Sequence, residues 1–82
     1  MNTVTILLFA TLRDYVGGKT IELEIPDGMT IGELTDFLVL RYPRLEKVKE
    51  SMMAAINREY AANGQVIPEH AEIAFFPPVS GG

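Results

Sequence analysis

The sequence predicts an α+β fold in which a mixed β-sheet carries one main helix on one face. Three observations lead to this class: a strand-like pair of segments at the N-terminus, a capped amphipathic helix after it, and further short β-rich segments in the second half. With 82 residues, of which 48% are hydrophobic, the chain has room for one domain with one modest core.

The first two predicted elements form a hairpin. Residues 4–10 are short, β-rich and almost wholly apolar, which is typical of a central strand buried on both faces. Gly17-Gly18 supplies a flexible turn, and residues 20–25 alternate polar with apolar side chains. We therefore expect a half-exposed second strand paired with the first.

A helix follows the break at Pro26-Asp27-Gly28. Thr30 and Glu33 have the spacing of a capping box, so the helix is predicted to begin at Thr30. It should end at Tyr42, because Pro43 lacks an N–H and has a fixed φ. The apolar positions expected to face the sheet are Ile31, Leu34, Phe37 and Leu38.

The second half of the chain completes the sheet. Residues 44–50 are a charged connector that could form a short helical turn, with Leu45 and Val48 as its apolar anchors. Residues 52–56 are predicted to form a third strand, residues 57–59 a turn and residues 72–76 the last strand. A right-handed helical crossover then favours a ubiquitin-like β-grasp with the first and last strands side by side in the centre.

Composition excludes several classes of function. Seven Lys and Arg residues against eleven Asp and Glu residues give a net charge of −4, which disfavours nucleic acid as a partner. The chain has no cysteine and a single histidine, His70, so we expect no metal site and no catalytic residue of its own. The short apolar run at the N-terminus predicts neither a signal peptide nor a membrane span, and a cytoplasmic protein is expected.

Three internal features are interpreted as structural rather than functional. Glu22 and Glu24 share the polar face of a strand, which favours a solvated face over an acid/base pair. In the pair Met52-Met53, strand alternation directs one of the two side chains into the core, so core filling is favoured over a soft-metal site. The basic run Arg41, Arg44, Lys47 and Lys49 is interrupted by Glu46 and Glu50, so a solvated helical face is favoured over an anion site.

The C-terminal segment differs from an ordinary domain end. Pro77 and Pro78 cannot donate to a sheet ladder, so the body is predicted to span residues 1–76 and a flexible tail residues 77–82. Six extended residues reach at most about 20 Å, enough to enter the active site of another protein. Gly81 and Gly82 have no Cβ atoms, so the terminal carboxylate could pass through a narrow channel.

Three stretches resemble a known family. They are Phe9-Ala10-Thr11-Leu12-Arg13, Asn57-Arg58-Glu59-Tyr60, and the last eight residues, Phe75-Phe76-Pro77-Pro78-Val79-Ser80-Gly81-Gly82. On these motifs the chain resembles the small, sulfur-carrying subunit of molybdopterin synthase, of the MoaD type, within the MoaD/ThiS group of ubiquitin-like proteins.

The resemblance implies a chemistry centred on Gly82. In this family the terminal carboxylate is adenylated by an E1-like, ATP-dependent adenylyltransferase of the MoeB type, and a sulfur donor protein then converts it to a thiocarboxylate. The resemblance further implies that the tail enters the active site of a large subunit of the MoaE type, where its sulfur converts cyclic pyranopterin monophosphate to molybdopterin. Catalytic groups would belong to that partner, ATP would serve only the activating enzyme, and no cofactor would be held permanently. The inserted residues would be Pro77, Pro78, Val79, Ser80 and Gly81.

A docking surface is expected near the exit of the tail. The matching motifs place Phe9, Tyr60 and Phe76 there, with Arg13 as a charged contact at the rim. The alternative for each aromatic residue is burial in the core.

Other functions remain open from the sequence. A carrier for thiazole or thiolated-tRNA biosynthesis would use the same terminal chemistry with a different acceptor. A ubiquitin-like modifier joined to lysines would also end in Gly-Gly, whereas a plain β-grasp interaction module would not need this ending.

Overall fold

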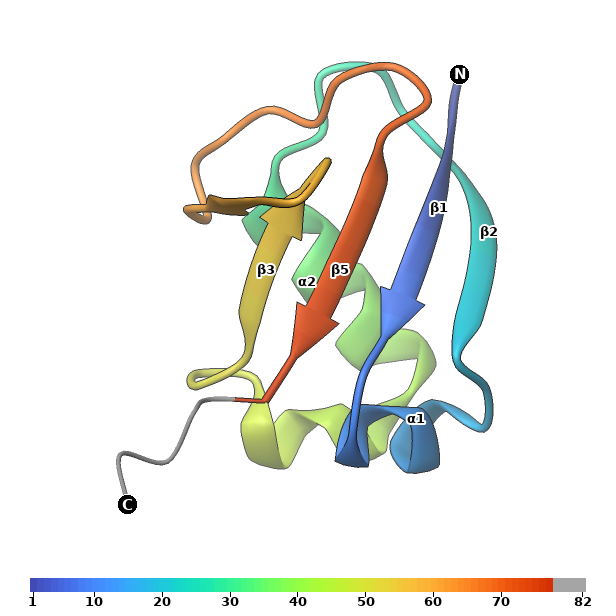
Figure 1. The fold of residues 1–82 in the computed structure, drawn as a ribbon, viewed down its shortest axis with the longest axis vertical. Helices are drawn as coiled ribbons and strands as arrows, with labels where there is room; N and C mark the ends of the chain where they lie inside the picture. The colour runs from blue at the N-terminus through green and yellow to red at the C-terminus, as the bar shows by residue number, and fades with distance from the viewer. Residues whose placement is uncertain (78–82) are drawn as a thin grey trace.

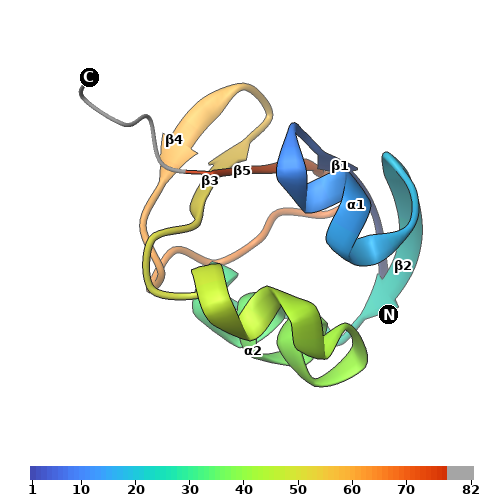
Figure 2. The same ribbon diagram turned by 90° about the horizontal axis from the view of Figure 1, so that it is seen from below.

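A mixed sheet forms one layer of the molecule and a long helix forms the other (Figures 1 and 2). The computed structural model describes residues 1–77. In chain order the elements are β1 (Asn2–Leu8), α1 (Thr11–Val16), β2 (Thr20–Ile25), α2 (Ile31–Arg41), the 3-10 helix η1 (Pro43–Val48), β3 (Met53–Ile56), β4 (Glu59–Ala61) and β5 (Glu72–Phe76).

The sheet has the strand order β2-β1-β5-β3-β4. The central strands β1 and β5 are parallel, with Leu8 opposite Phe75, while β2 and β3 run antiparallel to β1 and β5 respectively. Helix α2 therefore connects two strands, β2 and β3, that run in the same direction on opposite sides of the central pair. This topology is the predicted ubiquitin-like β-grasp, and the central placement of the first and last strands is confirmed.

The core lies between α2 and one face of the sheet. On β1 the side chains of Val4, Ile6 and Leu8 are at most 2% exposed, whereas Thr5 and Leu7 between them are half-buried. The prediction that this strand is buried on both faces is wrong, because α2 covers only one of them (Figure 2). We call the side packed against α2 the closed face and the other side the open face.

Helix α2 begins with the predicted capping box. The Glu33 N–H donates to Thr30 Oγ1 at 3.2 Å, and the Thr30 N–H donates to Glu33 Oε1 at 3.0 Å. This exchange satisfies two of the donors that a helix start leaves without partners. The expected inward position of Phe37 is wrong: its side chain is 37% exposed, and Thr35 and Val39 are buried instead.

The segment after β1 differs most from the sequence expectation. The strand ends at Leu8 rather than residue 10, and a helix that was not predicted, α1, follows. Ala10 precedes α1 with φ 53° and ψ −131°, a conformation that strains a residue with a Cβ. Helix α1 ends at Gly17 in the left-handed region, φ 86°, where a glycine avoids the same strain.

Strands β3 and β4 form a hairpin with a two-residue turn. Asn57 and Arg58 both have positive φ, 49° and 73°, as a tight turn that follows the twist of the strands requires. The turn was predicted, but the three-residue strand β4 was not. The connector before β3 is η1, in which Leu45 is buried as expected. Within residues 1–77, none of the helices has the length and hydropathy that a membrane crossing requires.

Candidate functional site

The chain leaves the sheet at the end of its central strand. Strand β5 ends at Phe76, which lies opposite Met53 of β3, and Pro77 follows as the last described residue. The parallel strand β1 ends beside it, so β1, β5 and α1 meet at one end of the molecule (Figure 1). The remaining predicted tail residues, Pro78, Val79, Ser80, Gly81 and Gly82, lie outside the described residues.

Apolar side chains gather on the open face next to this exit. Strand alternation places them on the opposite side from the core, and the pairing of β1, β5, β3 and β4 brings them together. We call this group the open-face patch; its members are Leu7, Phe9, Met53, Ala55, Tyr60, Ala74 and Phe76.

The aromatic side chains of the patch are accessible. Tyr60 is 72% exposed, Phe9 41% and Met53 38%, while Phe76 is half-buried. The rings of Tyr60 and Phe76 pack edge to face, with centroids 5.8 Å apart and an angle of 63° between their planes. Because this contact holds both rings in place, little side-chain entropy would be lost when a partner covers them.

Hydrogen bonds to backbone carbonyls hold Phe9 beside β5 and Arg13 at the end of β1. The Phe9 N–H donates to the Phe75 carbonyl at 3.1 Å, which extends the β1–β5 pairing past the end of β1. The Arg13 Nε–H donates to the Leu8 carbonyl at 3.2 Å, so the exposed Arg13 side chain is anchored to the end of the same strand.

The four predicted docking residues thus lie at the tail end of the fold, and none of them belongs to the buried core. Their role in binding stays a prediction. Strand alternation predicted that one of Met52 and Met53 points into the core, and Met52 does so; the sequence reasoning did not identify the other, Met53, as a member of the patch. The missing information was the strand boundary, because the direction of each methionine side chain follows from where β3 starts.

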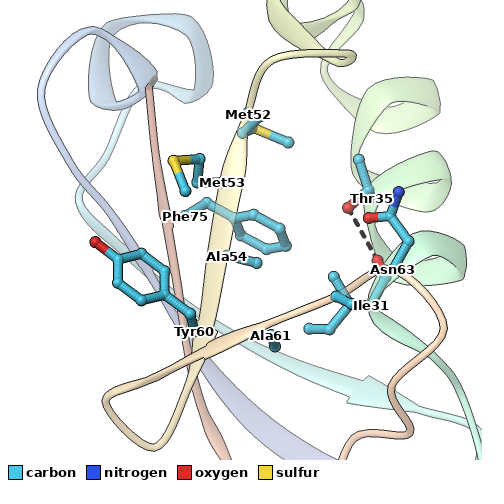
Figure 3. Close-up of a pocket in the computed structure, with 10 residues that line it drawn as sticks. Ile31, Thr35, Met52, Met53, Ala54, Tyr60, Ala61, Asn63 and Phe75 are labelled. Atoms are coloured by element: carbon cyan, nitrogen blue, oxygen red, sulfur yellow. Dashed lines mark hydrogen bonds between the residues drawn. The ribbon is translucent and has the colours of Figure 1, made fainter. Parts of the chain in front are cut away.

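A cavity of about 360 Å³ opens between the β3–β4 hairpin and the first turns of α2 (Figure 3). Phe75 forms part of its wall, and Thr35 lines the helix side, where its Oγ1–H donates to the Ile31 carbonyl at 2.9 Å. Tyr60 and Met53 belong to both the cavity and the open-face patch. In the described part of the chain all its lining residues are uncharged, which suits an apolar side chain better than an ionic ligand.

Side chains that could hold a metal do not cluster in this region. Across residues 1–77, no group of three or more His, Cys, Asp or Glu side chains is arranged to hold a metal ion. The features that the described residues bring together are the open-face patch and the point where the chain leaves β5.

Comparison with known proteins gives sequence matches over almost the whole chain. The sequence profile of the ThiS family matches residues 6–82. A molybdopterin synthase sulfur carrier subunit from Arabidopsis thaliana is 37% identical over 79 residues, which cover 96% of this chain and 82% of that protein.

Solved structures share the fold. The crystal structure of SAMP1, a small archaeal modifier protein from Haloferax volcanii, aligns with a TM-score of 0.83 and 32% identity over 99% of this chain and all of that one. A complex of subunits 1 and 2 of the molybdopterin-converting factor from Helicobacter pylori contains a chain with a TM-score of 0.67 at 16% identity, covering 98% of this chain and 99% of that chain, which shows the fold alone. The chain therefore belongs to the ThiS family of ubiquitin-like β-grasp proteins, as the three sequence motifs predicted.

Proposed function

We propose that this chain is the sulfur-carrier subunit of a molybdopterin synthase and that Gly82 carries the sulfur. The observation that carries the proposal is the extent of the family match, which continues through the terminal Gly81-Gly82 pair. The similarity to a sulfur carrier subunit over almost the whole chain supports the same assignment.

The chemistry begins with a carboxylate that is a poor electrophile. An oxygen of the Gly82 carboxylate attacks the α-phosphorus of ATP on an activating enzyme, pyrophosphate leaves, and an acyl adenylate forms. Hydrosulfide then attacks the carbonyl carbon, and AMP leaves with the bonding electron pair. If a donor protein supplies a persulfide instead, its attack gives an acyl disulfide, and a thiol must cleave the S–S bond, becoming oxidised to a disulfide, to release the thiocarboxylate. The product is a terminal thiocarboxylate, whose sulfur is the nucleophile toward cyclic pyranopterin monophosphate in the partner's active site. ATP is thus a substrate of the activating enzyme, and this chain holds no resident cofactor.

Recognition of the partners is assigned to the open-face patch. Its exposed aromatic residues, Phe9 and Tyr60, lie beside the point where the chain leaves the sheet, so a protein that covers the patch also receives the tail. The Helicobacter pylori complex provides a precedent for a two-subunit assembly in a protein of this fold. We expect both the large subunit and the activating enzyme to bind here.

The covalent state tests the proposal directly. The chain is incubated with ATP, the adenylyltransferase from the same organism and sodium sulfide, and intact mass and fragment ions are measured. We expect the exchange of one oxygen for sulfur at Gly82. No exchange, or exchange at another residue, contradicts the proposal.

Substitutions in the tail test whether its small size matters. Gly81→Ala adds a Cβ near the reacting carbonyl, and deletion of Gly82 moves the carboxylate by one residue. Both variants should lose sulfur transfer and keep the melting temperature of the unsubstituted chain. Loss of transfer only in proportion to loss of stability would argue against the proposal.

Conjugation to proteins is the second candidate function. It is favoured by the similarity to SAMP1, which is named as a small archaeal modifier protein. Immunoblots of source cells distinguish the two: a ladder of high-mass conjugates that depends on Gly82 supports a modifier, whereas a single free species supports a dedicated sulfur carrier.

A further inference from the structure

The basic side chains of the chain concentrate in two of its connections. The connections at the tail end, comprising residues 9–19 and 41–50, contain six of the seven basic side chains and three acidic ones, a balance of +3. The rest of the chain contains Arg58 and eight acidic side chains, a balance of −7, and the two together give the net charge of −4. A chain that is acidic on average thus has a basic end.

This basic end is assembled from separate elements. Figures 1 and 2 show α1 and the segment after α2 together at the end where the chain leaves β5. Helix α1 packs against η1, which brings residues far apart in sequence to one side of the molecule. We call the exposed residues Arg13, Lys19, Arg41, Arg44 and Lys47 the basic face.

The charges of the basic face are available for a partner. Lys49 is set apart because its Nζ lies 2.9 Å from Asp36 Oδ1, and this hydrogen bond and the charge of Asp36 raise the pKa of Lys49. Arg58, at the other end, pairs with Glu72 at 3.8 Å. Within residues 1–77, none of the five basic-face side chains lies within 4.0 Å of a carboxylate oxygen.

Aromatic rings hold two of the guanidinium groups in defined positions. The Arg44 guanidinium lies 5.6 Å from the centre of the Tyr15 ring, and that of Arg41 lies 6.0 Å from the Tyr42 ring. A guanidinium stacked on a ring keeps its hydrogen-bond donors directed to solvent. The face therefore presents ordered donors without carboxylate partners, an arrangement suited to carboxylates on another molecule.

We propose that the basic face docks onto an acidic protein surface that surrounds the channel receiving the tail, and that it orients the chain so that the tail arrives first. The inference rests on the proposed function and names the chemistry of its partner surface. The sequence alone favoured a solvated face because Glu46 and Glu50 interrupt the basic run. The fold adds two further residues to the same end of the molecule: Arg13 of α1 and Lys19, which follows α1.

A protein partner fits the charge pattern better than nucleic acid. The rest of the chain, with a balance of −7, would be repelled by an extended polyanion, whereas a protein can be acidic at one rim only. The basic face also adjoins the open-face patch at the tail exit, so one partner can contact both. Charges at the rim of an apolar contact act mainly on the association rate and on orientation.

Association kinetics with the large synthase subunit of the same organism test the proposal. The double variant Arg44→Glu/Lys47→Glu should associate about tenfold more slowly at low salt. Its dissociation rate should change little, and the difference should shrink as sodium chloride screens the charges. The control Arg58→Glu reverses a basic residue in the β3–β4 turn, at the other end of the sheet, and should associate at the rate of the unsubstituted chain.

Two further measurements separate an effect of charge from a loss of folding. Arg44→Gln/Lys47→Gln should give an intermediate rate, and thermal unfolding of each variant shows whether it is folded. Equal association rates for the Glu double variant and the Arg58→Glu control, or an effect confined to dissociation, would overturn the proposal.

Failure of the proposed function gives a different result. In that case the unsubstituted chain does not bind the large subunit at any salt concentration, and the basic face is tested with poly-L-glutamate and with a short DNA duplex by amide chemical-shift mapping. Shifts from poly-L-glutamate confined to residues 9–19 and 41–50, and stronger than those from DNA, support an acidic protein surface. Shifts spread over the whole chain, or a stronger response to DNA, contradict it.

Discussion

One face of the sheet is buried under α2, whereas the other face stays accessible. On the closed face, Ile6 and Phe75 lie under α2 and are at most 1% exposed. On the open face, Phe9 and Phe76 remain uncovered or half-covered, although their residue types are equally apolar. The two faces alternate residue by residue along β1 and β5, so hydrophobicity alone does not decide which side chains form the core. The position of the single long helix decides it.

This difference separates stability from recognition. Side chains on the closed face are already buried, so their apolar area is used in folding, whereas the open-face patch keeps its area for a partner. Substitutions on the two faces should therefore change different measured quantities.

The adjacent phenylalanines give the largest expected contrast. Phe75→Ala removes a fully buried ring and should lower the free energy of unfolding by about 3–5 kcal/mol, which for a domain of this size leaves little folded protein. Phe76→Ala should cost about 1 kcal/mol, since it loses partial burial and the edge contact with Tyr60. Urea denaturation measures both, and equal losses would break the distinction between the faces.

Binding should show the reverse order of effects. Phe76→Arg places a charge in the open-face patch and should weaken binding to the large synthase subunit by about 2–4 kcal/mol, on the scale of an interface hot spot. Calorimetric titration measures the affinity, with Thr3→Arg as the control because Thr3 is exposed at the other end of β1. If Phe76→Arg instead unfolds the isolated chain, Phe76 belongs to the core and the docking surface lies elsewhere.

The capping box offers a change confined to the closed side. Thr30→Ala removes the acceptor of the Glu33 N–H and should lower the free energy of unfolding by about 1 kcal/mol. Affinity for the partner should not change, because α2 lies on the far side of the sheet from the patch. A parallel loss of affinity and stability would indicate that the two faces are coupled.

The smallest effect concerns the strained start of α1. At φ 53° Ala10 is in a region that glycine occupies without strain, so Ala10→Gly should raise the free energy of unfolding by up to about 1 kcal/mol. The gain is limited because glycine also gives the unfolded chain more freedom. Thermal unfolding measures it, and a lower melting temperature would show that the Ala10 conformation is not a source of strain.

Much of the fold could be predicted because its signals are local. The capping residues Thr30 and Glu33 define the start of α2, Pro43 follows its end, and the alternation of residues 20–25 defines β2. The central pairing of the first and last strands followed from the handedness of the crossover.

The remaining features depend on contacts that a linear pattern does not encode. Helix α1 begins after Ala10, which has a positive φ although it is neither glycine nor asparagine, so the residue type does not indicate where this helix starts. Phe37 has helical spacing, but α2 turns it outward, and β4 is only three residues long. The basic face was missed for the same reason: its members come from α1, the turn after α1, α2 and η1, and only the fold places them at one end.

The parallel pairing of β1 with β5 has a consequence for synthesis. The first strand made by the ribosome has its central neighbour only when residues 72–76 emerge, so the sheet cannot close during most of translation. Until then β1 exposes a backbone edge, and the hairpin with β2 is too small to be stable alone. Completion of the body and emergence of the segment that follows β5 are thus nearly simultaneous. A chain that has not yet reached β5 lacks the folded surface that an activating enzyme would bind.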